Sequence, residues 1–260
     1  MHPFLEQMKF GASMRLRRSL RAGQNFLARS SFARDRRESN LAHLVMHHEL
    51  PIFRNLAGVD SRLFANKRVN LEIAVREIEG VVIRPGQTFS LWYLVKAPTA
   101  RRGFQEGLGI QRGRPVATVG GGLCQLSNAI FWLALHSDLQ VTERHHHSLD
   151  LFPDDHRHIP FGTGATIVYN FKDLRLYNPT DREFQLRFRV EDNRFISELF
   201  CSEVPEVRYT VREADHAFLK QPDGLYRRNT ILRECRGDQS NSTEVLFRNF
   251  AKCLYTLTEA

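Results

Sequence analysis

The sequence contains no apolar run approaching the roughly 20 residues that a membrane-spanning helix needs. Its first residues carry charges and lack the apolar stretch of a standard export signal. Cysteine is scarce: its four occurrences, at positions 124, 201, 235 and 253, form neither a C-x-x-C pair nor a dense cluster. That spacing argues against a secreted disulfide scaffold. We therefore expect a cytoplasmic protein.

Acidic residues are also scarce near the N-terminus, where nine Lys or Arg residues face three Asp or Glu residues between positions 1 and 40. Residues 1–60 are interpreted as a basic helical segment, with a second helix over Leu41–Leu56. Such a segment can lie on an anionic membrane surface, bind nucleic acid or form the solvated face of its own domain. No nucleic-acid module is present, so we expect no nucleic-acid partner and keep the inner membrane face as a candidate.

The remaining pattern predicts an α+β fold. Residues 61–202 form the main domain, and residues 203–260 form a C-terminal β extension packed on it. We expect a helix over Asn66–Gly80 and a short strand over Thr88–Trp92. Further strands are predicted over three segments, Ala165–Tyr169, Leu174–Tyr177 and Phe184–Val190, and three more between Glu206 and Leu257.

The most informative segment is the glycine run that ends at Gly121-Gly122-Leu123-Cys124 and leads into an apolar stretch. It predicts a Gly-rich turn before a buried helix, with Cys124 in the first turn. Free N–H groups at a helix start favour a thiolate and can bind an oxyanion. Gly121, Gly122, Gln125 and Ser127 are the candidate oxyanion or substrate contacts. The alternative is a tight turn with Cys124 as a core residue and its neighbours as first-turn caps.

A nucleophilic thiol needs a base, and a histidine is the usual choice. Alternation over Gln140–Phe152 predicts one strand with His145 and His147 on its inner face. These histidines are the candidate bases, although they could equally belong to a polar, hydrogen-bonded strand end. Arg144 is a candidate for binding a substrate carboxylate. Three carboxylates could orient the base: Glu143, Asp150 and Asp154.

A zinc site is a further alternative, because thiol and imidazole groups are zinc ligands. Their spacing matches no standard zinc signature, so we expect no metal and no other cofactor. The residues concerned are Cys124, His145, His147, His156 and His158.

Several motifs, in this order, resemble those of the VanW family over roughly residues 40–200. They are Pro85-Gly86-Gln87-Thr88-Phe89-Ser90, Arg102-Gly103-Phe104-Gln105-Glu106-Gly107, Gly120-Gly121-Gly122-Leu123-Cys124-Gln125-Leu126-Ser127, Glu143-Arg144-His145-His146-His147-Ser148 and Gly164-Ala165-Thr166.

The resemblance implies a link to the cell wall and to glycopeptide resistance. Some exported members resemble L,D-transpeptidases, which crosslink peptidoglycan through a thioester. This comparison implies that Cys124 is the nucleophile and that His147 or His145 is the base. Many exported members carry Asp where this chain has Gly164, which leaves the third catalytic group open.

Two functional hypotheses follow from these residues. The first is a cysteine-dependent acyl transferase that acts on a peptide or a peptidoglycan precursor. The second is a non-catalytic accessory module that binds a precursor or a protein partner. The zinc site is the third and weakest hypothesis.

Overall fold

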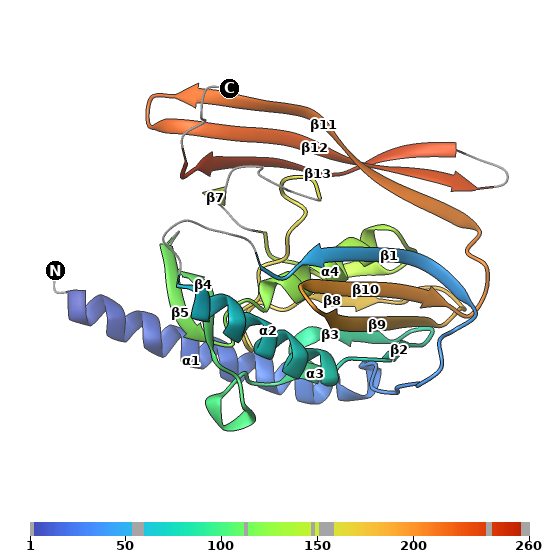
Figure 1. Ribbon diagram of the computed structural model, residues 1–260, viewed down its shortest axis with the longest axis horizontal. Coiled ribbons are helices and arrows are strands. Elements are labelled where there is room, and N and C mark those ends of the chain that lie inside the picture. Colours follow the sequence, from blue (N-terminus) through green and yellow to red (C-terminus); the bar gives the residue numbers. More distant parts are fainter. Residues whose placement is uncertain are drawn as a thin grey trace.

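The structure is a computed structural model that describes residues 3–53, 60–111, 114–146, 149–150, 159–237 and 241–255, with the backbone alone for residues 3–14 and 110–115. Helices and several small sheets alternate along the chain, so the α+β class is confirmed (Figure 1). The helices are α1 (Pro3–Leu27), α2 (Ser61–Arg76), α3 (Leu91–Val95) and α4 (Cys124–Leu135), with short 3-10 turns η1 (Arg29–Ser31) and η2 (Ala100–Arg102).

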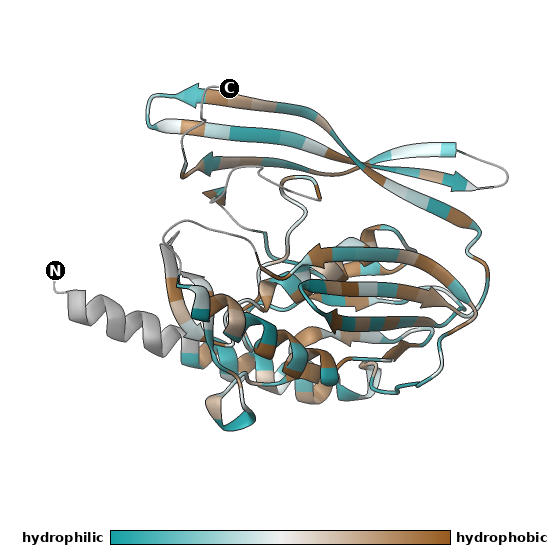
Figure 2. Cartoon of the chain, in the orientation of Figure 1, coloured by the Kyte–Doolittle hydropathy of each residue, from teal (hydrophilic) through white to brown (hydrophobic). Residues whose placement is uncertain are grey.

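The central antiparallel sheet has the strand order β1-β10-β9-β2. Hydrophobic and hydrophilic residues alternate along β9, and most of β10 is buried, which places one face of the sheet against the core (Figure 2). Its strands are β1 (His43–Pro51), β2 (Val82–Ile83), β9 (Phe184–Glu191) and β10 (Arg194–Cys201).

Two smaller sheets complete the main body, with strand orders β3-β8-β6 and β4-β5. Helix α4 packs against β1, β10 and β6, and α2 packs against β4 and β9. The strands are β3 (Thr88–Ser90), β4 (Glu106–Gln111), β5 (Arg114–Val119), β6 (Gln140–Glu143) and β8 (Arg175–Tyr177).

The C-terminal segment forms long antiparallel strands that lie as a separate layer over the main body (Figure 1). Its three predicted strands are confirmed. Two contacts tie this layer to the body: the rings of Phe131 in α4 and Phe247 pack together, and the Tyr209 hydroxyl donates to Asp138 at 2.6 Å. Arg182 contacts the other oxygen of the Asp138 carboxylate. The strands are β11 (Val207–Gln221), β12 (Gly224–Gly237) and β13 (Asn241–Cys253), with the two-residue β7 (Leu149–Asp150) parallel to β13.

The predicted helix over Leu41–Leu56 is wrong, because residues 43–51 form β1. Pairing with β10 satisfies the backbone of this segment along its length and buries His48 and Leu50. A tertiary neighbour therefore outweighs a local pattern that is compatible with a helix. The helix predicted over Asn66–Gly80 is confirmed as α2.

Three predicted strands need correction. The strand over Thr88–Trp92 stops at Ser90, whose hydroxyl accepts a hydrogen bond from the Tyr93 N–H and begins α3. The strand over Gln140–Phe152 stops at Glu143, so strand alternation does not reach His145. Residues 165–169 form no strand, because side chains of α4 bind that backbone instead. The strands expected at 174–177 and 184–190 are confirmed as β8 and β9.

The close approach of two backbones at Gly121 generates a stability prediction. A Cβ at Gly121 would lie 2.1 Å from the carbonyl oxygen of Gly107, and backbone cannot move aside as a side chain can. We expect Gly121→Ala to lower the free energy of unfolding by about 3 kcal/mol, measured by urea denaturation. Gly23→Ala is the matched control, since Gly23 lies in open space within α1 and the substitution should stabilise by about 0.5–1 kcal/mol. Equal effects of the two changes would contradict the prediction.

Candidate functional site

Helix α4 is enclosed by protein along most of its length and is open at its start. Every residue from Ala129 to Leu135 is buried, whereas Cys124, Gln125 and Asn128 remain partly exposed. The apolar sequence of the helix explains the burial, since all its sides favour contact with the core. The predicted placement of Cys124 in the first turn of a buried helix is confirmed.

The glycine turn before α4 is shaped by positive φ angles at Gly120 (77°) and Gly122 (94°), which favour glycine. Buried Asn70 fixes the turn from α2: its amide donates to the carbonyl of Gly121 at 2.9 Å, and its Oδ1 accepts the Gln105 N–H at 2.7 Å. The side chain of Lys67 passes against Gly122, where a Cβ would lie 2.4 Å from Lys67 Cγ. The turn is therefore held from α2 on one side.

The start of α4 presents donors. Within the described ranges, the backbone N–H groups of Gly122, Leu123 and Cys124 have no protein hydrogen-bond acceptor. Donors of this kind at a helix start can stabilise an anion or an oxyanion. No side chain caps the helix, since Leu123 occupies the capping position.

Opposing effects act on the pKa of the Cys124 thiol. Burial raises its pKa above the ordinary value, and this effect outweighs the backbone N–H of Ile167 and the positive charge of Lys67, which both favour the thiolate. Cys124 is thus mainly a neutral thiol at pH 7 in the unliganded protein. Lys67 is a neighbour that sequence reasoning missed, because it comes from a helix some sixty positions earlier.

An extended segment, Gly164–Ile167, lies between α4 and His145. Asn128 Oδ1 accepts the Ala165 N–H at 2.7 Å, and Ser127 Oγ donates to the Ala165 carbonyl at 2.6 Å. On its other side, the Thr166 N–H donates to the His145 carbonyl at 2.6 Å. The segment therefore brings the backbones of Cys124 and His145 to its two sides, and no hydrogen bond joins the thiol to the His145 imidazole.

His145 is paired with a carboxylate. Its Nε2 lies 3.1 Å from Glu143 Oε1, and its side chain is about one-third exposed. Glu143 also accepts hydrogen bonds from Arg21 at 2.6 and 2.8 Å and from the Asp173 N–H at 3.0 Å. Burial pushes the pKa of Glu143 upward, but these hydrogen bonds outweigh burial and leave the pKa below its ordinary value. Of the candidate orienting carboxylates that the structure describes, Glu143 and Asp150, it is Glu143 that bonds to His145.

The other predicted partners of the histidines lie elsewhere or outside the described residues. Buried Asp150 accepts a hydrogen bond from the Tyr255 hydroxyl at 2.7 Å and faces Arg227 at 3.4 Å, between β7 and the C-terminal sheet. His147 and Asp154 lie outside the described residues. The structure therefore places one of the two candidate bases.

Arg144 is held by the protein itself. Its guanidinium lies 4.5 Å from the ring centroid of Phe131 and 4.4 Å from that of Phe247. It donates to the carbonyls of Gly162 and Gly164, the latter at 3.0 Å. Burial lowers its pKa to about 10. Arg144 thus joins α4, the 162–164 loop and β13.

Two further candidates support the first turn of α4. Gln125 donates from Nε2 to the Pro51 carbonyl at 3.0 Å, whereas its Oε1 is buried without a partner among the described residues. Ser127 is buried and donates to the carbonyls of Cys124 and Ala165, so it does not satisfy the free N–H groups of the first turn, which was the capping role weighed from the sequence. Asn128 makes the complementary contact, because its Oδ1 accepts the Ala165 N–H.

The metal alternative receives no support from the part of the chain that the structure describes, where no three His, Cys, Asp or Glu residues gather as metal ligands. His147, His156 and His158 lie outside that part, so the zinc hypothesis stays untested. Among the helices searched, none has the length and apolar character needed to cross a membrane.

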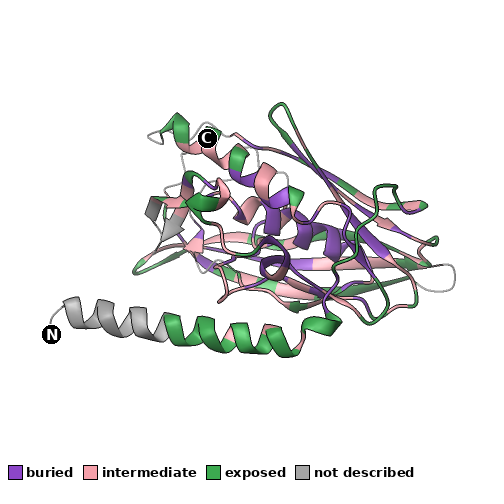
Figure 3. Ribbon diagram, turned by 90° about the horizontal axis from the view of Figure 1, so that it is seen from below, coloured by how far each residue is buried: buried purple, intermediate pink, exposed green. Residues whose placement is uncertain are grey.

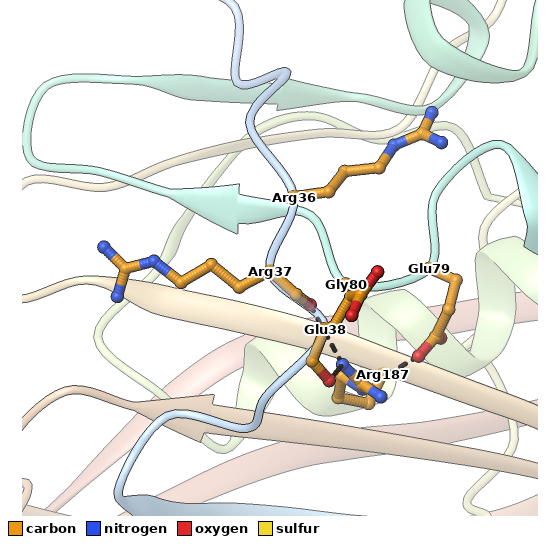
Figure 4. A pocket seen from close by; sticks show the side chains of 6 residues that line it. All are labelled: Arg36, Arg37, Glu38, Glu79, Gly80 and Arg187. Atoms are coloured by element: carbon orange, nitrogen blue, oxygen red, sulfur yellow. Dashed lines mark hydrogen bonds and ion pairs between the residues drawn. The ribbon is translucent and has the colours of Figure 1, made fainter.

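A separate cavity of about 430 Å³ opens beside β9 (Figure 4). Its charges are already neutralised: Arg187 contacts Glu79 at 2.8 Å and donates to the carbonyls of Arg37 and Glu38, while Arg36 donates to carbonyls at the end of α2. Burial raises the pKa of Glu79. The cavity contains none of the thiol or imidazole candidates, so it is a surface hollow between ion pairs.

Comparison with known proteins places these features in a family. The family model described as VanW like protein matches residues 66–200. The chain is 28% identical over 226 residues to the vancomycin B-type resistance protein VanW of Enterococcus faecalis, covering 86% of this chain and 82% of that protein. It is 27% identical over 135 residues to the uncharacterized protein YoaR of Bacillus subtilis, covering 52% of this chain and 43% of YoaR. No solved structure matches the chain.

The raised pKa of Cys124 generates a prediction about alkylation by iodoacetamide, read for each cysteine by peptide mass spectrometry. We expect the alkylation rate of Cys124 to rise with pH. The apparent pKa of this rise should be higher in the folded protein than in urea, where a thiol titrates at about 8.5. Lys67→Met should raise that pKa further, because it keeps the aliphatic stem and removes the charge. A folded-state pKa below the value in urea would contradict the prediction.

Because Glu143 is bonded to Arg21, His145 and the Asp173 N–H, we expect the stability of the protein to depend on pH. The folded pKa of Glu143 lies below its unfolded value near 4.5, so its contribution is fully present above that pH and disappears as pH falls through the folded pKa. Glu143→Gln should lower the free energy of unfolding by about 2 kcal/mol at pH 7 and should flatten the decline below pH 4.5. Urea denaturation at pH 7 and in the acid range checks both, with exposed Glu244→Gln as control. A decline of unchanged steepness in Glu143→Gln would disprove this assignment.

Proposed function

Because more than half of this chain matches the family model, the chain belongs to the VanW-like family, and we propose that it is a cysteine-dependent acyl transferase acting on a peptide or peptidoglycan precursor. The name of the Enterococcus relative, a vancomycin B-type resistance protein, favours a role in cell-wall biology and glycopeptide resistance. The observation that carries the proposal is the position of Cys124 at the one open end of a buried helix, next to free N–H groups.

In the proposed reaction, the Cys124 thiol gives its proton to a histidine and its sulfur attacks an amide carbonyl of the precursor. The C–S bond forms, the oxyanion receives hydrogen bonds from backbone N–H groups at Gly122, Leu123 and Cys124, and the C–N bond then breaks. The leaving amine takes the proton from the histidine. A second amine or water attacks the thioester and restores the thiol.

The base in this proposal is His145 or His147. His145 already carries the carboxylate partner that orients a catalytic imidazole, since Glu143 accepts from its Nε2. Gly164 leaves no carboxylate at the position where many exported members have Asp, and Glu143 supplies one instead. Binding of a substrate over the 164–167 segment would exclude water from the thiol and align it with the imidazole.

A second candidate function is a non-catalytic module that binds the same class of precursor or a protein partner. The raised pKa of Cys124 favours it, because a nucleophilic cysteine usually has a depressed pKa. The missing hydrogen bond between the thiol and His145 points in the same direction. The two candidates share a ligand class and differ in whether a covalent bond forms.

Intact-mass spectrometry with synthetic peptidoglycan stem tetrapeptides and pentapeptides separates the two candidates. If acyl transfer occurs, the wild-type protein should gain the mass of the peptide less its leaving amine, and Cys124→Ser should gain nothing while it still binds the peptide. His145→Gln should slow adduct formation by about 100-fold if His145 is the base. Cys235→Ser is the matched control and should behave like the wild type.

A non-catalytic binding module would give a different result. Calorimetry would show equal Kd values for the peptide with the wild type and with Cys124→Ser, and no adduct would form at any pH between 6 and 9. These results would establish the binding module in place of the transferase. Stoichiometric zinc lost on Cys124→Ser would instead support the metal site.

A further inference from the structure

Helix α1 carries an apolar stripe that the protein leaves uncovered. Leu16, Leu20 and Leu27 are 62%, 60% and 82% exposed, and their spacing with Gly23 places all four on one helix face. The stripe covers about 16 Å of helix at 1.5 Å per residue. A row of leucines exposed in this way is costly in water and marks an interaction surface.

The opposite face of α1 is fixed to the body by polar contacts, so the orientation of the stripe is determined. Arg21 binds Glu143, Asn25 receives a hydrogen bond from Arg175, and the Arg18 carbonyl accepts one from Asn170. Figure 3 shows the described part of α1 exposed along one side of the molecule, away from the buried residues of the core. The leucines therefore point outward from a helix that is held in place.

The charge around the stripe has one sign. Residues 7–34 contain seven Lys or Arg residues and no Asp or Glu. Arg15 and Arg17 are exposed on the two flanks of the stripe formed by Leu16 and Leu20. A surface of leucines bordered by arginines is complementary to an anionic, partly apolar partner.

We propose that α1 binds an anionic phospholipid membrane and lies in its plane. The leucine stripe enters the boundary between headgroups and acyl chains, and the exposed arginines contact lipid phosphates. This inference is independent of the proposed acyl transfer.

Two features favour a membrane over a protein partner. The stripe lies on the convex face of a single helix, which suits a flat, deformable surface better than a knob-and-hole interface. A second copy of the chain packed stripe to stripe would bring arginines against arginines, with no acidic residue between positions 7 and 34 to pair with them. An anionic bilayer removes both difficulties.

Vesicle co-sedimentation of the full chain tests the proposal, using phosphatidylcholine vesicles with and without 30% phosphatidylglycerol. We expect binding to the anionic vesicles, weak binding to the neutral ones, and weaker binding as salt increases. A triple variant, Leu16→Ser, Leu20→Ser and Leu27→Ser, should lower the partition coefficient by about tenfold or more. The double variant Arg15→Gln and Arg17→Gln should weaken binding to the anionic vesicles alone.

Matched controls are exposed residues elsewhere on the surface. Leu44→Ser, Val204→Ser and Leu254→Ser together, or Arg208→Gln with Arg248→Gln, should leave the partition coefficient unchanged. Circular dichroism and urea denaturation verify that each variant is folded. The proposal is overturned if the wild type does not bind anionic vesicles, or if the α1 variants bind them as the wild type does. It is also overturned if light scattering shows that the wild type is a dimer and that the leucine substitutions convert it to a monomer.

Discussion

The enclosure of α4 is the constraint on which the rest of the structure depends. From Ala129 to Leu135 the helix has no side that favours water. It is covered by β1 and β10 on one side and by β6 on another, and Phe131 reaches the C-terminal sheet through Phe247. Burial of a large apolar side chain stabilises a fold by about 1.5–3 kcal/mol, so these contacts determine how the separate sheets are assembled. The first turn is the exception, and it is there that Cys124 meets solvent.

Polar contacts at that first turn have to be made by specific groups, because buried backbone cannot be left without partners. Asn70 of α2 donates a hydrogen bond to the Gly121 carbonyl of the glycine turn. Ser127 and Asn128 of α4 bond to the carbonyl and the N–H of Ala165. These contacts fix the backbone around the helix start by hydrogen bonds from two different helices. Donors held in a defined geometry suit both stabilisation of an oxyanion and selective binding of a ligand.

The ionic cluster at Glu143 links helix α1 to the candidate base His145. It holds α1 through Arg21 and holds the imidazole of His145 through the same carboxylate. Asp173 lies in the same cluster, where burial raises its pKa although Ser90 and Trp92 donate hydrogen bonds to it. The N-terminal helix and the candidate base are therefore parts of one hydrogen-bonded network, and a change in the position of α1 would alter the contact between Glu143 and His145.

Much of the fold follows from short-range pattern. The helix at Cys124, the helix α2, strands β8 and β9 and the three C-terminal strands were predictable, because each has a clear period and clear turn residues. Long-range pairing was not predictable. Residues 43–51 became a strand because β10 lies beside them, and the strand at 140 ended early because the chain turns toward the 166 backbone.

The sequence by itself determined that a glycine turn presents Cys124 at the start of an apolar helix, because glycine torsions and helix periodicity are local properties. It also determined the basic, leucine-bearing character of the first helix. Only the tertiary structure decided that Lys67 and Ile167 surround the thiol, that Glu143 is the carboxylate paired with His145, that Arg144 is enclosed by Phe131 and Phe247, and which face of α1 is exposed. These arrangements join residues far apart in the chain, and their burial and charge exist only once the core around α4 has formed.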